Sequence, residues 1–93
     1  MRQNLTPKIL YNEYKLGLID KKSACDFLTS FIENNNDENL RIESIKLIQE
    51  IENNTTTKFN LFKNLLISDS NESVRYTTAK LIIKYLLFLL TLI

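Results

Sequence analysis

Apolar residues recur every three or four positions along most of this chain, which is the spacing that places them on one side of an α-helix. The clearest stripe consists of Ala24, Phe27, Leu28, Phe31 and Ile32. Three polar runs interrupt the pattern: NNND, NNTTT and SDSN. These three breaks, together with Gly17 after the first segment, predict five helices, over about 6–16, 20–33, 37–52, 58–67 and 71–93. Strands are not needed anywhere, so the expected fold class is all-α.

Residues at the segment ends support these boundaries. Thr6, Asp20 and Asp37 are suitable N-caps, and Pro7 suits the first position of a helix. We expect a threonine of the NNTTT run to cap the fourth helix, which then begins at Lys58. The single glycine follows the first helix and favours a left-handed stop there. The connections are short, so neighbouring helices should be antiparallel.

The chain contains an internal repeat, in which residues 37–51 align with residues 71–85. DENLRIESIKLIQEI at 37–51 aligns with NESVRYTTAKLIIKY at 71–85, and Phe27-Leu28 aligns with Leu61-Phe62. The second predicted helix therefore corresponds to the fourth, and the third to the fifth. A period of this size is typical of an α-solenoid, in which each helix pair buries its apolar face against the next pair.

The third polar break adds a family resemblance. In LLISDSNESVRYTTAKLI, acidic and amide residues turn the chain before a Val-Arg pair opens the next helix. Asp69 and Asn71 stand five and three positions before Val74, and Asn35 and Asp37 hold the same places in the first copy. This arrangement resembles the HEAT repeat, from roughly residue 19 to the C-terminus.

The resemblance implies a short right-handed α-solenoid of about two and a half antiparallel helix pairs. It would form a single domain over 1–93, with pairs at 6–33 and 37–67 and an unpaired last helix at 71–93. It also implies a ladder of polar contacts between neighbouring repeats. The residues expected in it are Asp37, Arg41, Asp69, Asn71 and Arg75. Ile45 departs from the small residue that the family keeps, which Ala79 matches, and the period is shorter than that of most HEAT repeats.

A second family stays open. YNEYKLGLIDKKSACDFL at 11–28 looks somewhat like a tetratricopeptide unit. The period of that family is about 34 residues, which is also the offset between the two copies here. The second copy, however, has no glycine, no terminal proline and no matching tyrosine. The HEAT-like interpretation is therefore placed first.

The residue inventory leaves little room for catalysis. The chain has no histidine, which excludes catalytic triads and histidine metal sites, and its one glycine permits no phosphate-binding loop. Cys25 has no base partner and lies beside the apolar stripe, so we expect a buried structural cysteine. We predict no enzyme, and no catalytic, cofactor-binding or metal-binding residues.

Charge and cysteine content bear on partners and compartment. Twelve basic and eleven acidic residues give a net charge of +1, which weighs against a nucleic-acid partner. The single cysteine cannot form an internal disulfide, and the N-terminus lacks the apolar run of a signal peptide. We therefore expect a cytoplasmic protein.

The last segment, LIIKYLLFLLTLI at 81–93, is apolar at every position except Lys84 and Thr91. Its 13 residues would span about 20 Å as a helix, against about 30 Å for the core of a bilayer. Three interpretations stay open: an incomplete repeat array, a homo-oligomer formed through helix 71–93, or a short membrane anchor.

These observations predict a non-enzymatic protein–protein interaction or scaffold module that presents a rigid helical surface and takes no small-molecule substrate. The alternative is a membrane-associated adaptor anchored by 81–93. In HEAT-like arrays the second helices line a concave face, so the candidate contacts are Asp26, Thr29, Ser30, Glu33, Asn60, Lys63 and Asn64. The aligned Leu47 and Leu81 are expected in the core. The sequence names no partner.

Overall fold

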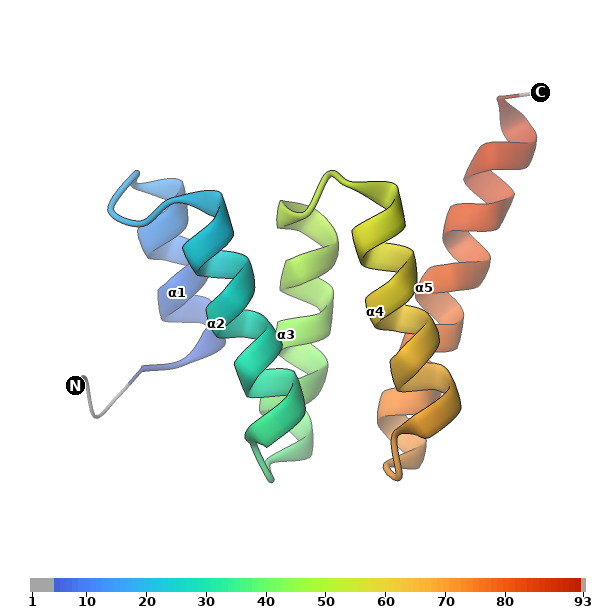
Figure 1. Ribbon diagram of the computed structural model, residues 1–93, viewed down its shortest axis with the longest axis horizontal. Coiled ribbons are helices and arrows are strands. Elements are labelled where there is room, and N and C mark those ends of the chain that lie inside the picture. The colour runs from blue at the N-terminus through green and yellow to red at the C-terminus, as the bar shows by residue number, and fades with distance from the viewer. Residues whose placement is uncertain (1–4, 93) are drawn as a thin grey trace. The chain divides into compact units, whose positions relative to one another are not determined.

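The computed structural model describes residues 5–92 and confirms an all-α fold. Its helices are α1 (Pro7–Lys15), α2 (Lys21–Asn34), α3 (Glu38–Ile51), α4 (Thr55–Ser68) and α5 (Glu72–Thr91), with no strand among the described residues (Figure 1). The helices form two compact units, α1 to α3 and α4 with α5. The grouping of all of 1–93 into one domain stays a prediction.

Each helix is preceded by an N-cap residue. Its side chain accepts a hydrogen bond from an amide of the first turn, which would otherwise lack a partner. The caps are Thr6, Asp20, Asp37, Asn54 and Asn71. The expected start of the fourth helix at Lys58 is wrong, since Asn54 Oδ1 accepts from the amide of Thr57 at 2.9 Å. Asparagine is a better N-cap than threonine, so the helix begins earlier and its three threonines occupy the first turn.

Gly17 ends α1 as the sequence predicts. Its φ of 78° is the left-handed conformation that glycine adopts most readily. The amide of Leu18 donates to Glu13 O at 2.9 Å, and that of Gly17 donates to Tyr14 O at 3.0 Å. This pair of bonds is the Schellman motif, which satisfies carbonyls at the helix end.

In the first unit, α2 packs along α3, and α1 contacts both helices. The buried apolar side chains of these helices include Leu10, Ala24, Leu28, Ile32, Ile45, Ile48 and Ile51. The buried stripe of α2 is narrower than predicted, because Phe27 is 46% exposed and Phe31 is only half-buried. Positions 24, 28 and 32 follow one line along the helix, and the two phenylalanines lie beside it.

In the second unit, α5 packs against α4 and is therefore not unpaired within the described residues. The buried side chains include Phe62, Leu65, Val74 and Thr78. Tyr85 Oη lies 3.3 Å from Thr55 Oγ1, at the first residue of α4. The two helices are antiparallel (Figure 1), so residues 86–92 extend beyond the start of α4. The extensive packing thus joins α2 with α3 and α4 with α5, whereas the expected pairs were 6–33 and 37–67.

The connections within these two pairs repeat at the predicted offset. Asn35 Oδ1 accepts from the amide of Asp37 at 2.7 Å, and Asp69 Oδ1 accepts from the amide of Asn71 at 2.9 Å. The second residue of each connection then caps the next helix. The same local hydrogen bonds therefore turn the chain in both copies.

A buried hydroxyl repeats in the same way. Ser44 Oγ donates to Leu40 O at 2.8 Å, and Thr78 Oγ1 donates to Val74 O at 2.7 Å. Both hydroxyl residues are fully buried, and they hold the same place in the two aligned copies. Bonding to the carbonyl four residues earlier lets a small polar side chain sit in an apolar core without an unsatisfied group.

The two aligned arginines each join the two helices of their own pair by a hydrogen bond. Arg41 Nε donates to Ile32 O at 2.6 Å, and Arg75 Nη1 donates to Asp69 O at 2.8 Å. Each bond reaches a carbonyl at the C-terminal end of the preceding helix, where such groups lack a helical partner. The ladder expected between neighbouring repeats stays a prediction.

The expected core positions Leu47 and Leu81 are only half-buried, whereas Ile48 is 2% exposed. We predict that Ile48→Ala lowers the free energy of unfolding by about 2–5 kcal/mol, because it leaves a cavity. Leu47→Ala on the same helix should cost clearly less, about 1–2 kcal/mol. Urea unfolding followed by circular dichroism measures both. Equal costs would contradict the burial pattern of α3.

Candidate functional site

The candidate contact residues lie on α2 and α4 and reach solvent to differing extents. Six are exposed, namely Asp26, Ser30, Glu33, Asn60, Lys63 and Asn64, and Thr29 is half-buried. Three pairs occupy aligned positions of the two copies: 26 and 60, 29 and 63, and 30 and 64. Each copy of the helix pair therefore presents these positions from its first helix. The α2 set and the α4 set belong to different units and are described separately.

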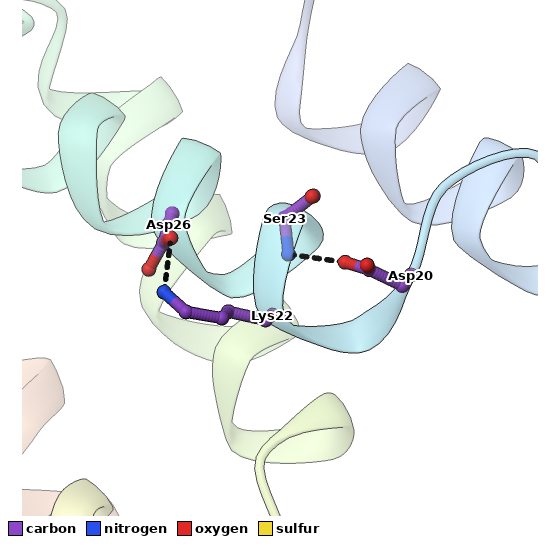
Figure 2. A network of polar contacts seen from close by, with 4 residues as sticks. All are labelled: Asp20, Lys22, Ser23 and Asp26. Atoms are coloured by element: carbon purple, nitrogen blue, oxygen red, sulfur yellow. Dashed lines mark hydrogen bonds and ion pairs between the residues drawn. The ribbon is translucent and has the colours of Figure 1, made fainter.

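Two polar side chains of the α2 set, those of Asp26 and Ser30, are engaged with their own helix. Asp26 Oδ2 lies 3.1 Å from Lys22 Nζ, an ion pair whose side chains are 69% and 84% exposed (Figure 2). Ser30 Oγ accepts from Asn34 Nδ2 at 3.3 Å. Exposed ion pairs one helical turn apart contribute little to stability. Both contacts are weak enough for a partner to replace them.

The start of α2 is fixed by Asp20. Its Oδ1 accepts from the amide of Ser23 at 2.7 Å (Figure 2). This hydrogen bond from the Ser23 amide lowers the pKa of the Asp20 carboxyl. A hydrogen bond from the Ser23 side chain and the positive charge of Lys22 lower it further. The cap is therefore ionised at neutral pH, where a negative charge at a helix N-terminus is favourable.

A shallow depression of about 300 Å³ lies on the α2 side of the first unit. It is lined by Leu5, Phe27, Ser30, Phe31, Asn34 and Asn35. Two aromatic rings and one leucine line it together with uncharged polar groups. The sequence predicted Ser30 as a contact residue but grouped both phenylalanines with the apolar stripe of the helix. Their partial exposure could have been inferred from the sequence, because positions 27 and 31 lie to one side of the line through positions 24, 28 and 32.

The α4 set also lies beside apolar side chains. Phe59 is 43% exposed and precedes Asn60, and Ile67 is 71% exposed at the position that aligns with Glu33. Lys63 gives this set a positive charge where the aligned Thr29 is neutral. The two sets share positions but differ in chemistry, so they would not contact identical groups on a partner.

Cys25 is half-buried rather than buried as expected. Burial raises the pKa of its thiol, and so do the charge of the Glu52 carboxylate and a hydrogen bond to it, against a smaller opposing effect of Lys21. Lys21 Nζ lies 3.5 Å from Glu52 Oε1. A raised pKa keeps the thiol protonated at neutral pH, and a protonated thiol is a poor nucleophile.

Over residues 5–92, no cluster of three or more potential side-chain ligands is placed to hold a metal ion. None of the helices in this range combines the length and the apolar character needed to cross a bilayer.

Comparison with protein-family models, with curated proteins and with solved structures finds no match.

The environment of Cys25 predicts how its reactivity responds to its neighbours. Glu52→Gln should lower the thiol pKa and speed alkylation by iodoacetamide at pH 8, because the negative charge is lost. Lys21→Gln, the matched control of opposite charge, should slow it. The raised pKa of Cys25 also affects the pH dependence of folding. Its contribution to the free energy of unfolding is fully present below the unfolded-state pKa of 9.0 and is lost as the pH rises through the higher folded-state pKa. Equal alkylation rates in both variants would contradict this arrangement.

Proposed function

We propose that this chain is a non-enzymatic protein-interaction module built from HEAT-like helix pairs. The observation that carries the proposal is the repeated pair itself, with the same connection, the same buried hydroxyl and a carbonyl-bound arginine in each copy. Such construction is typical of proteins that present a surface rather than hold a reaction centre. The raised pKa of the Cys25 thiol and the absence of histidine support the same conclusion.

The depression on α2 is the proposed point of contact. Interfaces draw much of their binding energy from aromatic anchors in a desolvated centre, surrounded by polar groups that exclude water. Phe27 and Phe31 supply the aromatic part, and Ser30 and Asn34 supply hydrogen-bonding groups at the edge. Because all six lining residues are uncharged, the depression suits an apolar side chain of a partner protein rather than a charged ligand.

The capped connections explain how such a surface would be held. Binding costs less entropy when the contact residues are already ordered. α2 is fixed at its start by Asp20, and the carbonyl of Ile32 near its end is bound by Arg41. The mechanism is therefore presentation of a preformed surface without chemistry. The cytoplasm, which suits a chain with one free cysteine, is the proposed compartment.

A second candidate function is the membrane-associated adaptor. Exposed apolar side chains at the end of α5 favour it, including Leu87, Leu90 and Leu92, each more than half exposed. A helix that does not cross a bilayer can still lie in its interface. Such peripheral helices, however, usually carry a strongly polar face opposite the apolar one, and positions 85–92 contain no charged residue.

A peptide selection tests the proposed contact. A phage-displayed random peptide library would be selected on the purified chain, and enriched peptides measured against two variants. Phe27→Ser should weaken binding at least tenfold, because the peptide loses its aromatic contact. Leu16→Ser, which changes a more exposed apolar residue outside the depression, should change binding less than twofold. Failure to enrich any peptide, or equal loss in both variants, would contradict the proposal.

A further inference from the structure

α5 carries a second apolar face, opposite the one that packs on α4. Val74 and Thr78 are buried, and Tyr85 reaches Thr55; at 100° per residue these three positions share one side of the helix. Tyr76, Ile83, Leu87 and Leu90 lie on the other side, with exposures of 64%, 56%, 58% and 65%.

This second face has the spacing of a coiled-coil seam. We define the seam as Tyr76, Lys80, Ile83, Leu87 and Leu90, which follow one another at intervals of four, three, four and three residues. Alternating intervals of this kind are the a and d positions of a heptad repeat, the pattern by which two helices pack along their length. All five residues are exposed in the structure.

The size of the exposed surface indicates a protein partner. A large side chain has roughly 150–250 Å² of surface, so the exposed parts of the large apolar side chains of α5 and its C-cap amount to roughly 800 Å². More than half of this area belongs to the seam and to Leu86, which flanks it. That part, roughly 500 Å², lies near the upper end of the range of roughly 300–600 Å² for the largest apolar patch of a typical monomer, and such patches are often functional. It is comparable with the area of less than about 600 Å² that each partner contributes to a small, weak interface.

We propose that the partner is a second copy of this chain, paired with the first through antiparallel α5 helices. Placing Ile83 of one copy opposite Leu87 of the other also places Lys80 opposite Leu90, so one two-fold operation pairs the last four seam residues of each copy. The proposal is independent of the contact proposed on α2.

Lys80 decides the orientation of the two helices. Parallel pairing in register would set the two Lys80 ammonium groups against each other in the centre of the seam. The antiparallel register separates them by ten residues along the axis, about 15 Å. It also brings each Lys80 beside the last turn of the opposite helix, whose carbonyls carry partial negative charge.

Nothing within α5 already supplies that positive charge at its end. The last turn of α5 contains no basic residue, and a cation near a helix C-terminus is stabilising. Lys80 can lay its aliphatic stem over Leu90 of the other copy and keep its ammonium group at the edge of the interface. The single lysine at a seam position thus specifies register and orientation, as polar a residues do in coiled coils.

The test compares two matched variants of the full chain by light scattering after gel filtration, without detergent. At roughly 100 μM, a concentration well above a micromolar dissociation constant, the wild-type chain should have twice the 10.9 kDa mass of one copy. Leu87→Glu should raise the dissociation constant of the dimer by about a hundredfold or more, because each copy would lose a buried leucine and place a carboxylate in the apolar seam. Phe88→Glu, at a similarly exposed position off the seam, should change it less than fivefold.

Circular dichroism establishes that both variants remain helical, so that loss of the dimer reports on the seam. A monomeric wild-type chain, or equal loss of the dimer in both variants, overturns the proposal. A monomeric chain that floats with vesicles of phosphatidylcholine and phosphatidylserine would instead assign the end of α5 to a membrane surface. It would leave the α2 contact standing, because the peptide selection tests that contact separately.

Disulfide trapping tests the orientation. In a Cys25→Ser background, chains carrying Ile83→Cys and chains carrying Leu87→Cys would be mixed and oxidised. Antiparallel pairing predicts that the mixed disulfide exceeds either homodimeric disulfide by at least tenfold. Homodimeric disulfides in excess would show parallel pairing and overturn the assigned register.

Discussion

The amides at the start of each helix, which have no partner within the helix, determine where this chain turns. An asparagine or aspartate side chain satisfies them at four of the five helix starts, and a threonine does so at the first. The connections within the two helix pairs have one further hydrogen bond. The side chains of Asn35 and Asp69 accept from the amides of the cap residues Asp37 and Asn71. Connections of three residues can then reverse the chain without glycine or proline. The antiparallel pairs, and with them every surface considered above, depend on these bonds.

The fold and the repeat were predictable because they depend on short-range signals. Caps such as Asp37 and Asn71 act within three residues of their own position, and the constant offset between the copies is visible when the sequence is aligned with itself. Ser44 and Thr78 also align, although their burial could not be read from their polarity. The boundary at Asn54 was missed because adjacent asparagine and threonine residues compete for the same capping role, and the stronger cap prevails.

Burial was harder to predict, because it depends on which side of a helix meets a neighbour. Phe27 and Leu28 are adjacent and both apolar, yet Leu28 is fully buried and Phe27 is 46% exposed. Adjacent residues of a helix point about 100° apart, so Leu28 faces the core while Phe27 contributes to the contact surface on α2. α5 presents the same difficulty, since its sequence is apolar on nearly every side after position 80. Packing on α4 uses only one side of it, and the length of α5 beyond Tyr85 leaves the rest without cover in the second unit.

The central claim is that α2 with α3 and α4 with α5 are two copies of one structural unit. Nuclear Overhauser effects in the labelled full-length chain test this claim directly, because they report which side chains lie close together across each pair. The account predicts that apolar contacts between α2 and α3 recur between α4 and α5 at the aligned positions, and that Arg41 and Arg75 each contact the end of the preceding helix, at Ile32 and Asp69. Contacts between α4 and α5 in a different register, or their absence, would contradict it.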